Sequence, residues 1–325
     1  MSKMNAIQAV NAALAQALEE DPKVLVFGED IADREGGGVT GTCKGLSTRF
    51  GDRVRSTPIS EQAIVGAAIG AALGGYKPVC EIMLMNFTAV AMDMIFNHAA
   101  KLRFMSGGQS EVPIVIRTLT GAGWQTAGQH SDQLEGWFAH AAGIKVVSPS
   151  EPAEYKGLLL AAIQDPDPVM FIENSQTLFV PGEVADDQGP IPLGKARTIQ
   201  EGSDLTIVTW GSMVLRSRAA LAPLAEAGIS VELIDLRTVN PWDKAAVLTS
   251  AAKTNRVLVV HEAVRNFGPG AEIAASVNEE LFGQLKAPVR RLGAPQCAVP
   301  FAKVLEDAFM VSPDQIVAAA KGLCN

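Results

Sequence analysis

The sequence is poor in cysteine and in net positive charge, and it has no long hydrophobic run. Its four cysteines are scattered, and no two of them have the spacing of a metal site or a redox pair. This excludes a disulfide framework and favours a reducing compartment. The longest apolar stretch, residues 63–73, is about half of the roughly 20 residues that a membrane-spanning helix needs.

Acidic residues outnumber basic ones, with 35 Asp and Glu against 27 Lys and Arg and a net charge of −8. Nucleic acids and anionic membranes bind most favourably to surfaces with clustered cations, so neither is expected as a partner. Hydrophobic residues make up 48% and charged residues 19% of the chain. This composition excludes disorder and allows a large core together with surface buried in an oligomer.

Residues 1–10 contain one lysine and no arginine, and they lack an apolar core with a cleavage pattern. They resemble neither a secretory signal nor a mitochondrial presequence, so we expect a bacterial protein of the cytoplasm. The chain lacks Gly-x-Ser-x-Gly and His-Glu-x-x-His, and the Gly-x-Gly-x-x-Gly spacing at residues 36–41 has no expected strand running into it. NAD dehydrogenases and serine hydrolases therefore lose their main sequence support.

Short β-branched runs alternate with Ala- and Leu-rich stretches, which predicts an α/β fold with parallel sheets. A Pro-, Gly- and Asp-rich segment at residues 180–194 interrupts this rhythm and predicts a boundary between two domains. We expect domains at residues 1–186 and 187–325. The expected strands are 24–27, 79–82, 114–118, 145–148, 169–173, 205–209, 231–235, 257–261 and 289–292. The expected helices are 5–20, 61–73, 88–105, 132–142, 152–163, 213–227, 244–252, 270–281 and 313–321.

Glu61 opens a predicted helix that is otherwise uncharged and rich in small residues. One interpretation is ordinary capping, with Ser60 at the N-cap and the Glu61 carboxylate at the positive end of the helix dipole. The other is a ligand site, because Gly66 and Gly70 weaken the helix unless something packs close to it.

His130 lies in a Gly-rich loop that follows a predicted strand, and Asp132 with Glu135 predicts a capping box for the next helix. Such loops lie at the carboxyl ends of strands, where open α/β folds bind ligands. A histidine there suits acid/base chemistry, although a structural role is equally compatible. His98, His140 and His261 stand in helix or strand contexts that do not point to catalysis.

Several segments together resemble the beta subunits of the thiamine-diphosphate-dependent component of 2-oxo acid dehydrogenase complexes. The matching segments run in family order along nearly the whole chain: 26–30, 57–61, 78–83, 105–108, 112–115, 129–131, 143–150, 234–238 and 299–301. Residues 39–40 and the stretch from 116–118 to 122–123 are most similar to acetoin and pyruvate dehydrogenase beta subunits.

The resemblance implies a transketolase-like pyrimidine-binding domain followed by a transketolase C-terminal domain. It also implies that Mg2+ and the diphosphate are held by a Gly-Asp-Gly motif on an alpha subunit, because this chain has no such motif. The expected assembly has two alpha and two beta chains, and a lipoyl acyltransferase is the expected acceptor. The expected activity is cleavage of a 2-oxo acid such as pyruvate, or of acetoin, followed by acyl transfer.

The resemblance also assigns roles to individual residues. Glu61 would share a proton with the aminopyrimidine ring, and His130 would act near the substrate carboxylate or the acyl acceptor. Phe87 would stack on the pyrimidine, with Glu29, Ile59 and Met83 lining the same pocket. Carbonyl oxygens would hold a potassium ion, and their residues are Ile114, Ala162, Ile163, Asp165 and Asp167.

Three departures from the family pattern bear on specificity, namely Ser56 for aspartate, Asp132 for glutamine and Ala142 for proline. Residues 84–86, beside the expected acyl pocket, leave the substrate open. Two alternatives remain at this point. One is a free-standing carboligase that forms acyloins without a lipoyl partner, and the other is a non-catalytic assembly subunit.

Overall fold

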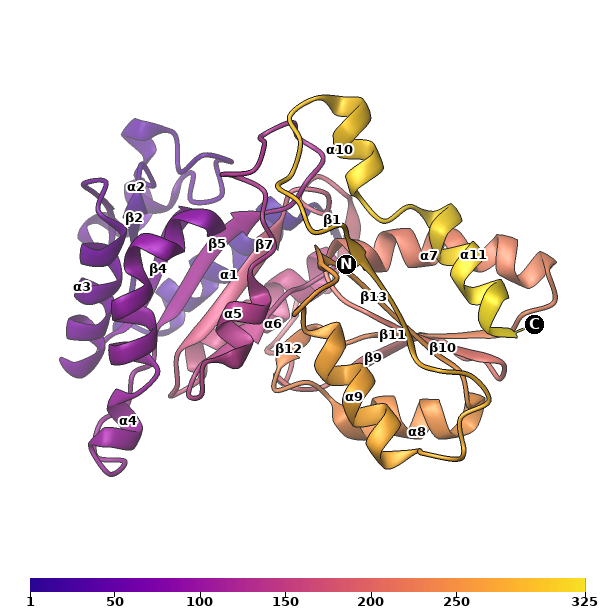
Figure 1. The fold of residues 1–325 in the computed structure, drawn as a ribbon. Coiled ribbons are helices and arrows are strands. Elements are labelled where there is room, and N and C mark those ends of the chain that lie inside the picture. Colours follow the sequence, from indigo (N-terminus) through magenta and orange to yellow (C-terminus); the bar gives the residue numbers. More distant parts are fainter. Residues whose placement is uncertain (325) are drawn as a thin grey trace. The chain divides into compact units, whose positions relative to one another are not determined.

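The computed structural model describes residues 1–324, which divide into two compact units. The first contains Met1–Thr120 and Trp137–Leu193, and the second contains Gly121–Gly136 and the chain from Gly194 onward. Each unit has a mainly parallel sheet flanked by helices, as Figure 1 shows, so the expected α/β class is confirmed. The boundary between independently folding domains at residues 186 and 187 stays a prediction.

The sheet of the first unit follows the order β6-β7-β5-β4-β2-β3, and all these neighbours are parallel. The strands are β6 (Lys145–Val147), β7 (Val169–Asn174), β5 (Val115–Thr120), β4 (Lys77–Leu84), β2 (Val24–Glu29) and β3 (Val54–Thr57). The short edge strand β3 was not predicted, because its four residues give too little alternation. A separate antiparallel pair joins β1 (Ser2–Met4) to β8 (Gly182–Val184).

Helices α1 (Ala6–Glu20) and α6 (Pro152–Gln164) pack against one another and bury the core that includes Val24, Val26 and Phe171. A reciprocal capping box between Asn5 and Gln8 begins α1. Helix α3 (Glu61–Leu73) packs against β4 and has the bounds that the sequence predicts. The short elements are η1 (Asp33–Glu35), α2 (Leu46–Phe50), η2 (Gly51–Arg53) and α5 (Glu135–His140).

The single helix expected at residues 88–105 is wrong. Three short elements replace it, namely the 3-10 helix η3 (Met85–Ala91), the π-helix η4 (Met94–Ala99) and α4 (Leu102–Met105). The segment contains neither glycine nor proline, so local composition could not signal the breaks. Tertiary contacts therefore override a continuous helical propensity here.

The sheet of the second unit has the order β14-β13-β10-β11-β9, with only β9 antiparallel to its neighbour. Its strands are β9 (Arg197–Gln200), β10 (Leu205–Thr209), β11 (Val231–Asp235), β13 (Val257–Val264) and β14 (Arg290–Ala294), and β12 (Thr238–Asn240) follows β11 along the chain. The helices are α7 (Ser212–Glu226), α8 (Lys244–Thr254), α9 (Gly270–Glu280), α10 (Lys303–Phe309) and α11 (Pro313–Cys324). The core includes Leu205, Leu233 and Ile316, with α7 packed against α11.

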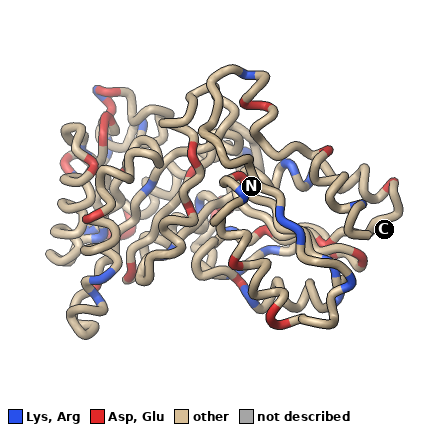
Figure 2. Tube along the Cα trace, viewed as in Figure 1, with Lys and Arg blue, Asp and Glu red and all other residues tan. Residues whose placement is uncertain are grey.

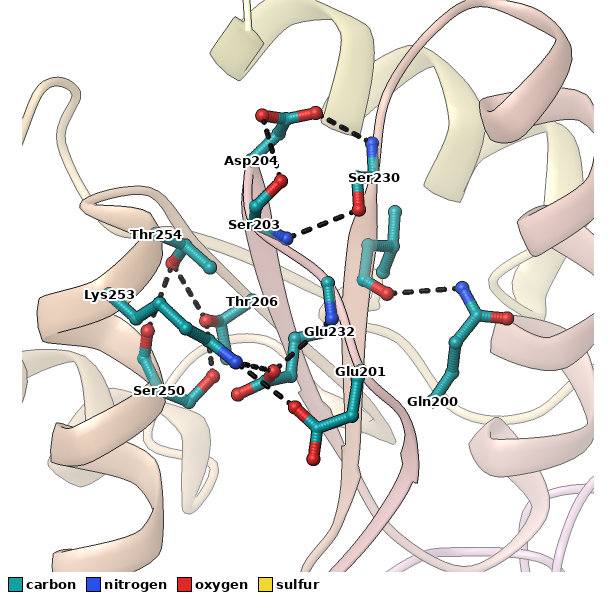
Figure 3. A network of polar contacts seen from close by, with 12 residues as sticks. Gln200, Glu201, Ser203, Asp204, Thr206, Ser230, Glu232, Ser250, Lys253 and Thr254 are labelled. Carbon is teal, nitrogen blue, oxygen red and sulfur yellow. Dashed lines mark hydrogen bonds and ion pairs between the residues drawn. The ribbon is translucent and has the colours of Figure 1, made fainter.

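Polar contacts join α8 to β10 and β11 (Figure 3). The Thr206 hydroxyl lies 2.6 Å from that of Ser250 and 2.8 Å from that of Thr254. Lys253 forms ion pairs with Glu232 and Glu201 at the edge of this network. Because the buried hydroxyls satisfy one another, the polar interface costs little to bury.

Acidic and basic positions are interspersed in each unit (Figure 2). No helix in the described part of the chain is long and apolar enough to cross a membrane.

Candidate active site

Glu61 is the first residue of α3, and its side chain is buried. Ser60 occupies the N-cap position, but its hydroxyl makes no capping hydrogen bond. The capping interpretation therefore lacks its main contact. Glu61 itself lies in the first turn of α3, where its carboxylate faces the positive end of the helix dipole, and the ligand-site interpretation stays a prediction.

Glu29 ends β2 and is buried close enough to Glu61 for the two carboxyl groups to interact. Burial raises the pKa of Glu29, and the negative charges of Glu61, Asp30 and Glu81 raise it further. Its Oε1 is buried without a hydrogen-bond partner among residues 1–324. The two neighbouring carboxyl groups thus present a buried oxygen that can bind a polar ligand.

The other expected cofactor residues lie within or shortly after β3 and β4. Met83 lies near the end of β4, and Phe87 lies in η3, which packs against α3; both side chains are half-buried. Ile59 is 79% exposed. A cavity of about 660 Å³ lies next to this region, lined by Phe27, Pro58 and Ala67 among others, but none of the expected cofactor residues lines it.

A buried charge cluster was missed by the sequence analysis. Arg117 on β5 is 1% exposed and binds Glu81 on β4 at 2.8 Å and Glu173 on β7 at 2.6 Å. Burial alone lowers the pKa of Arg117, but attraction to the two carboxylates outweighs it and the net shift is upward. Cys43 lies 3.8 Å from the same guanidinium. The available sequence signal was Glu81, Arg117 and Glu173, which interrupt three largely apolar strands.

His130 lies in the segment Gly121–Gly136, which belongs to the second unit. It is half-buried in a turn, where its backbone N–H donates to the Ala127 carbonyl at 3.2 Å. The hydroxyls of Thr126 and Ser131 close this turn at 2.7 Å. Helix α5 begins at Glu135, three residues later than expected, and the Glu135 carboxylate accepts a hydrogen bond from the Trp210 indole rather than closing a capping box.

The remaining histidines have structural settings. His98 lies 3.6 Å from Asp93, and His140 is exposed at the end of α5. His261 is fully buried and stacks on Trp210 with ring centroids 5.6 Å apart. Burial lowers the pKa of His261 to about 4, so the ring is neutral near pH 7.

The expected potassium ligands lie around the end of α6 and the loop that follows it. The Ile114 carbonyl accepts from the Val169 N–H, and the Ala162 carbonyl accepts from the Asp165 N–H. The Asp165 carboxylate binds Lys145 at 2.6 Å, and the Asp167 carboxylate binds Arg103 at 2.7 Å. These carboxylates are engaged by cations, so a metal would meet backbone oxygens here.

Among residues 1–324, no cluster of three or more His, Cys, Asp or Glu side chains could hold a metal ion.

Residues 2–180 match the family described as transketolase, pyrimidine binding domain, and residues 194–316 match transketolase, C-terminal domain. The acetoin:2,6-dichlorophenolindophenol oxidoreductase beta subunit of Cupriavidus necator is 45% identical, covering 98% of this chain and 97% of that one. The chain belongs to the transketolase-like beta subunits of 2-oxo acid and acetoin dehydrogenases.

Two further relatives of these beta subunits span the same length. The 2-oxoisovalerate dehydrogenase beta subunit of Bacillus subtilis is 40% identical over 100% of both chains. The pyruvate dehydrogenase E1 beta subunit of Acholeplasma laidlawii is 41% identical, covering 100% of this chain and 99% of that one. A split-gene transketolase, described as an inactive beta4 tetramer, superposes with a TM-score of 0.82 at 21% identity, over 99% of this chain and 98% of that one. That likeness supports the fold.

The family implies dependence on thiamine diphosphate and an alpha partner. The expected beta-subunit function and enzyme class are confirmed.

Proposed function

We propose that this beta subunit and an alpha partner cleave a 2-oxo acid or acetoin and pass the acyl group to a lipoyl acyltransferase. The buried pair of Glu61 and Glu29, with its unpartnered oxygen, is the observation that supports the site. A free buried acceptor and a shared proton suit the amino and ring nitrogens of an aminopyrimidine. Bound thiamine diphosphate supplies a thiazolium carbon that becomes nucleophilic when it loses its proton.

In this proposal Glu61 shares a proton with the pyrimidine ring nitrogen, and the buried oxygen of Glu29 holds the neighbouring polar edge. Phe87 covers the ring face, while Met83 and Ile59 exclude water around it. The burial of Glu61 and Glu29 supports their roles because it strengthens each hydrogen bond that they make to the ring.

The first test replaces Glu61 by glutamine. The amide cannot share an acidic proton, so deuterium exchange at the thiazolium carbon in the complex should slow by about 10²–10⁴-fold. The matched control is Gln62→Ala, because Gln62 is the exposed neighbour on the same helix turn. Exchange at the wild-type rate in Glu61→Gln contradicts the role.

The diphosphate and Mg2+ are assigned to the alpha partner, in an assembly of two alpha and two beta chains. The support is that this chain has no Gly-Asp-Gly motif and that its described residues offer no metal-binding cluster. Calorimetry should therefore find weak binding of thiamine diphosphate to the isolated chain and tight binding to the co-expressed pair. Light scattering of the pair tests the stoichiometry.

His130 is assigned to substrate orientation and acyl transfer. His130→Ala should leave deuterium exchange at the thiazolium carbon intact and slow reductive acylation of a lipoyl domain by about 10²–10⁴-fold. Oxidation of the same substrate by an artificial dye should fall less. An equal fractional loss in both assays, normalised to assembled complex, points to a structural histidine instead.

A potassium ion is assigned to the carbonyls of Ile114, Ala162, Ile163, Asp165 and Asp167. Two of these carbonyls stand in the last turn of α6; that of Ala162 accepts the Asp165 N–H and would have to bind the ion with its second lone pair. Replacing K+ by a bulky ammonium ion of equal ionic strength should lower the melting temperature of the complex. An unchanged melting temperature contradicts an occupied site.

Dye reduction with acetoin, pyruvate and 3-methyl-2-oxobutanoate will assign the substrate, with and without lipoyl domain. We also propose a cytoplasmic location, since the four cysteines are unpaired in the described residues and suit a reducing compartment. Cell fractionation tests it.

A further inference from the structure

The loop that carries His130 is held by three buried carboxylates of the second unit. Glu262, which lies on β13, accepts the Ala122 N–H at 2.8 Å and the Ser212 hydroxyl. Glu306, which lies on α10, accepts the Gly123 N–H at 2.7 Å and the Gln125 N–H at 3.1 Å. Glu135, at the far end of the loop, accepts from Trp210 at 3.2 Å. The loop is therefore fixed on both sides of His130.

Of the three carboxylates, Glu306 accepts from the most loop amides in the described contacts. Its side chain is fully buried, and its carboxylate accepts from two backbone N–H groups about 180 residues away in sequence. Hydrogen bonds to a carboxylate are roughly twice as strong as neutral ones. They also supply acceptors for loop amides that have no helix or strand to satisfy them.

The loop backbone is strained over the stretch from its contacts with Glu306 to His130. Gln125 and Ala127 have φ values of 55° and 62°, a region that non-glycine residues rarely adopt. Gly128 is packed so closely that a Cβ there would lie 3.1 Å from the Ala298 side chain. Strain of this kind persists only where surrounding contacts impose it. The Glu306 contact at Gln125 lies five residues before His130, at the start of the strained stretch.

We propose that Glu306 is a positioning residue for the His130 loop, and that the His130 step of the reaction depends on it. The inference rests on the proposed role of His130. Loss of the carboxylate releases two amides, the loop leaves its strained conformation, and the imidazole loses its fixed position. Misplacement of about 1 Å is enough to cost about a hundredfold in rate.

The first experiment measures the loop itself by amide hydrogen exchange with mass spectrometry on the full chain. In Glu306→Ala, the amides of Gly123 and Gln125 should exchange about ten- to hundredfold faster than in the wild type. Glu306→Gln keeps the volume and one acceptor, so its effect should be intermediate. Asp307→Asn is the control, since Asp307 is the exposed next residue of α10 and pairs only with Lys303 in the described contacts.

The second experiment measures the reaction in the complex with the alpha partner. Glu306→Ala should slow acylation of a lipoyl domain by about ten- to hundredfold and spare deuterium exchange at the thiazolium carbon. The double variant Glu306→Ala with His130→Ala should be no slower than His130→Ala alone, because both changes act on one step. If Glu306 had only a structural role, Glu306→Ala would lower both rates, and its effect would multiply the loss caused by His130→Ala.

Unchanged exchange at Gly123 and Gln125, or multiplied losses in the double variant, overturns the positioning role. A failure of the proposed function looks different. It would show as the absence of a selective acyl-transfer loss in His130→Ala, a measurement that does not involve Glu306.

Discussion

Removal of the Arg117 guanidinium should destabilise the first unit strongly. In Arg117→Met, the carboxylates of Glu81 and Glu173 stay buried and lose the cation that lies 2.8 Å and 2.6 Å from them. Breaking a buried ion pair by removing one partner costs about 3–5 kcal/mol. For a unit of this size each kcal/mol lowers the melting temperature by about 2–4 °C, so a fall of about 6–20 °C is expected.

The pH dependence identifies the cause of the loss. Burial raises the pKa of Glu173 even with Arg117 present, and the pKa should rise further without the guanidinium. A carboxyl whose folded pKa exceeds its unfolded value stabilises the fold below the unfolded value, and this contribution is lost as pH rises through the folded pKa. The Arg117→Met variant should therefore lose more stability at pH 8 than at pH 5.

Urea unfolding, monitored by circular dichroism at pH 5 and pH 8, measures the free energy of unfolding of both proteins at each pH. Arg103→Met is the control, because the Arg103 ion pair with Asp167 is partly exposed and worth about 1 kcal/mol or less. Adding Glu81→Gln and Glu173→Gln to Arg117→Met should restore much of the stability, since no charge is then left unpaired. A loss no greater than that of Arg103→Met, with the same value at both pH values, would refute the argument.

Two further predictions concern glycine and histidine. Gly143→Ala should lower the free energy of unfolding in urea by about 2–4 kcal/mol, because a Cβ there would lie 1.9 Å from the Ala100 carbonyl oxygen at a φ of 100°. The control is Gly75→Ala, which has a φ of 88° but open space around it and should show only the smaller backbone cost. The pKa of His261 falls from 6.5 to about 4 on folding, so the neutral ring contributes stability above pH 6.5 that is lost as pH falls toward 4. The loss of about 3 kcal/mol over that range should disappear in His261→Asn, and equal slopes in both proteins would count against it.

The sequence by itself determined the elements whose signal is local. The bounds of α3, β10 and β11 were predicted to the residue, because runs of β-branched or small apolar residues end at strong turn signals there. The order of family segments along the chain also identified the beta-subunit type, and the comparisons confirmed it. Glu61 and His130 were candidates from their local context alone, and their catalytic roles stay predictions.

Only the tertiary structure decided the features that depend on residues far apart in sequence. It broke the expected helix at residues 88–105, moved the start of α5 to Glu135, and buried Arg117 between carboxylates from two neighbouring strands. It also joined Glu306 to amides about 180 residues earlier in the chain. Propensity and periodicity report each residue against its near neighbours, whereas these contacts exist only because folding makes distant groups satisfy one another's charges and hydrogen bonds.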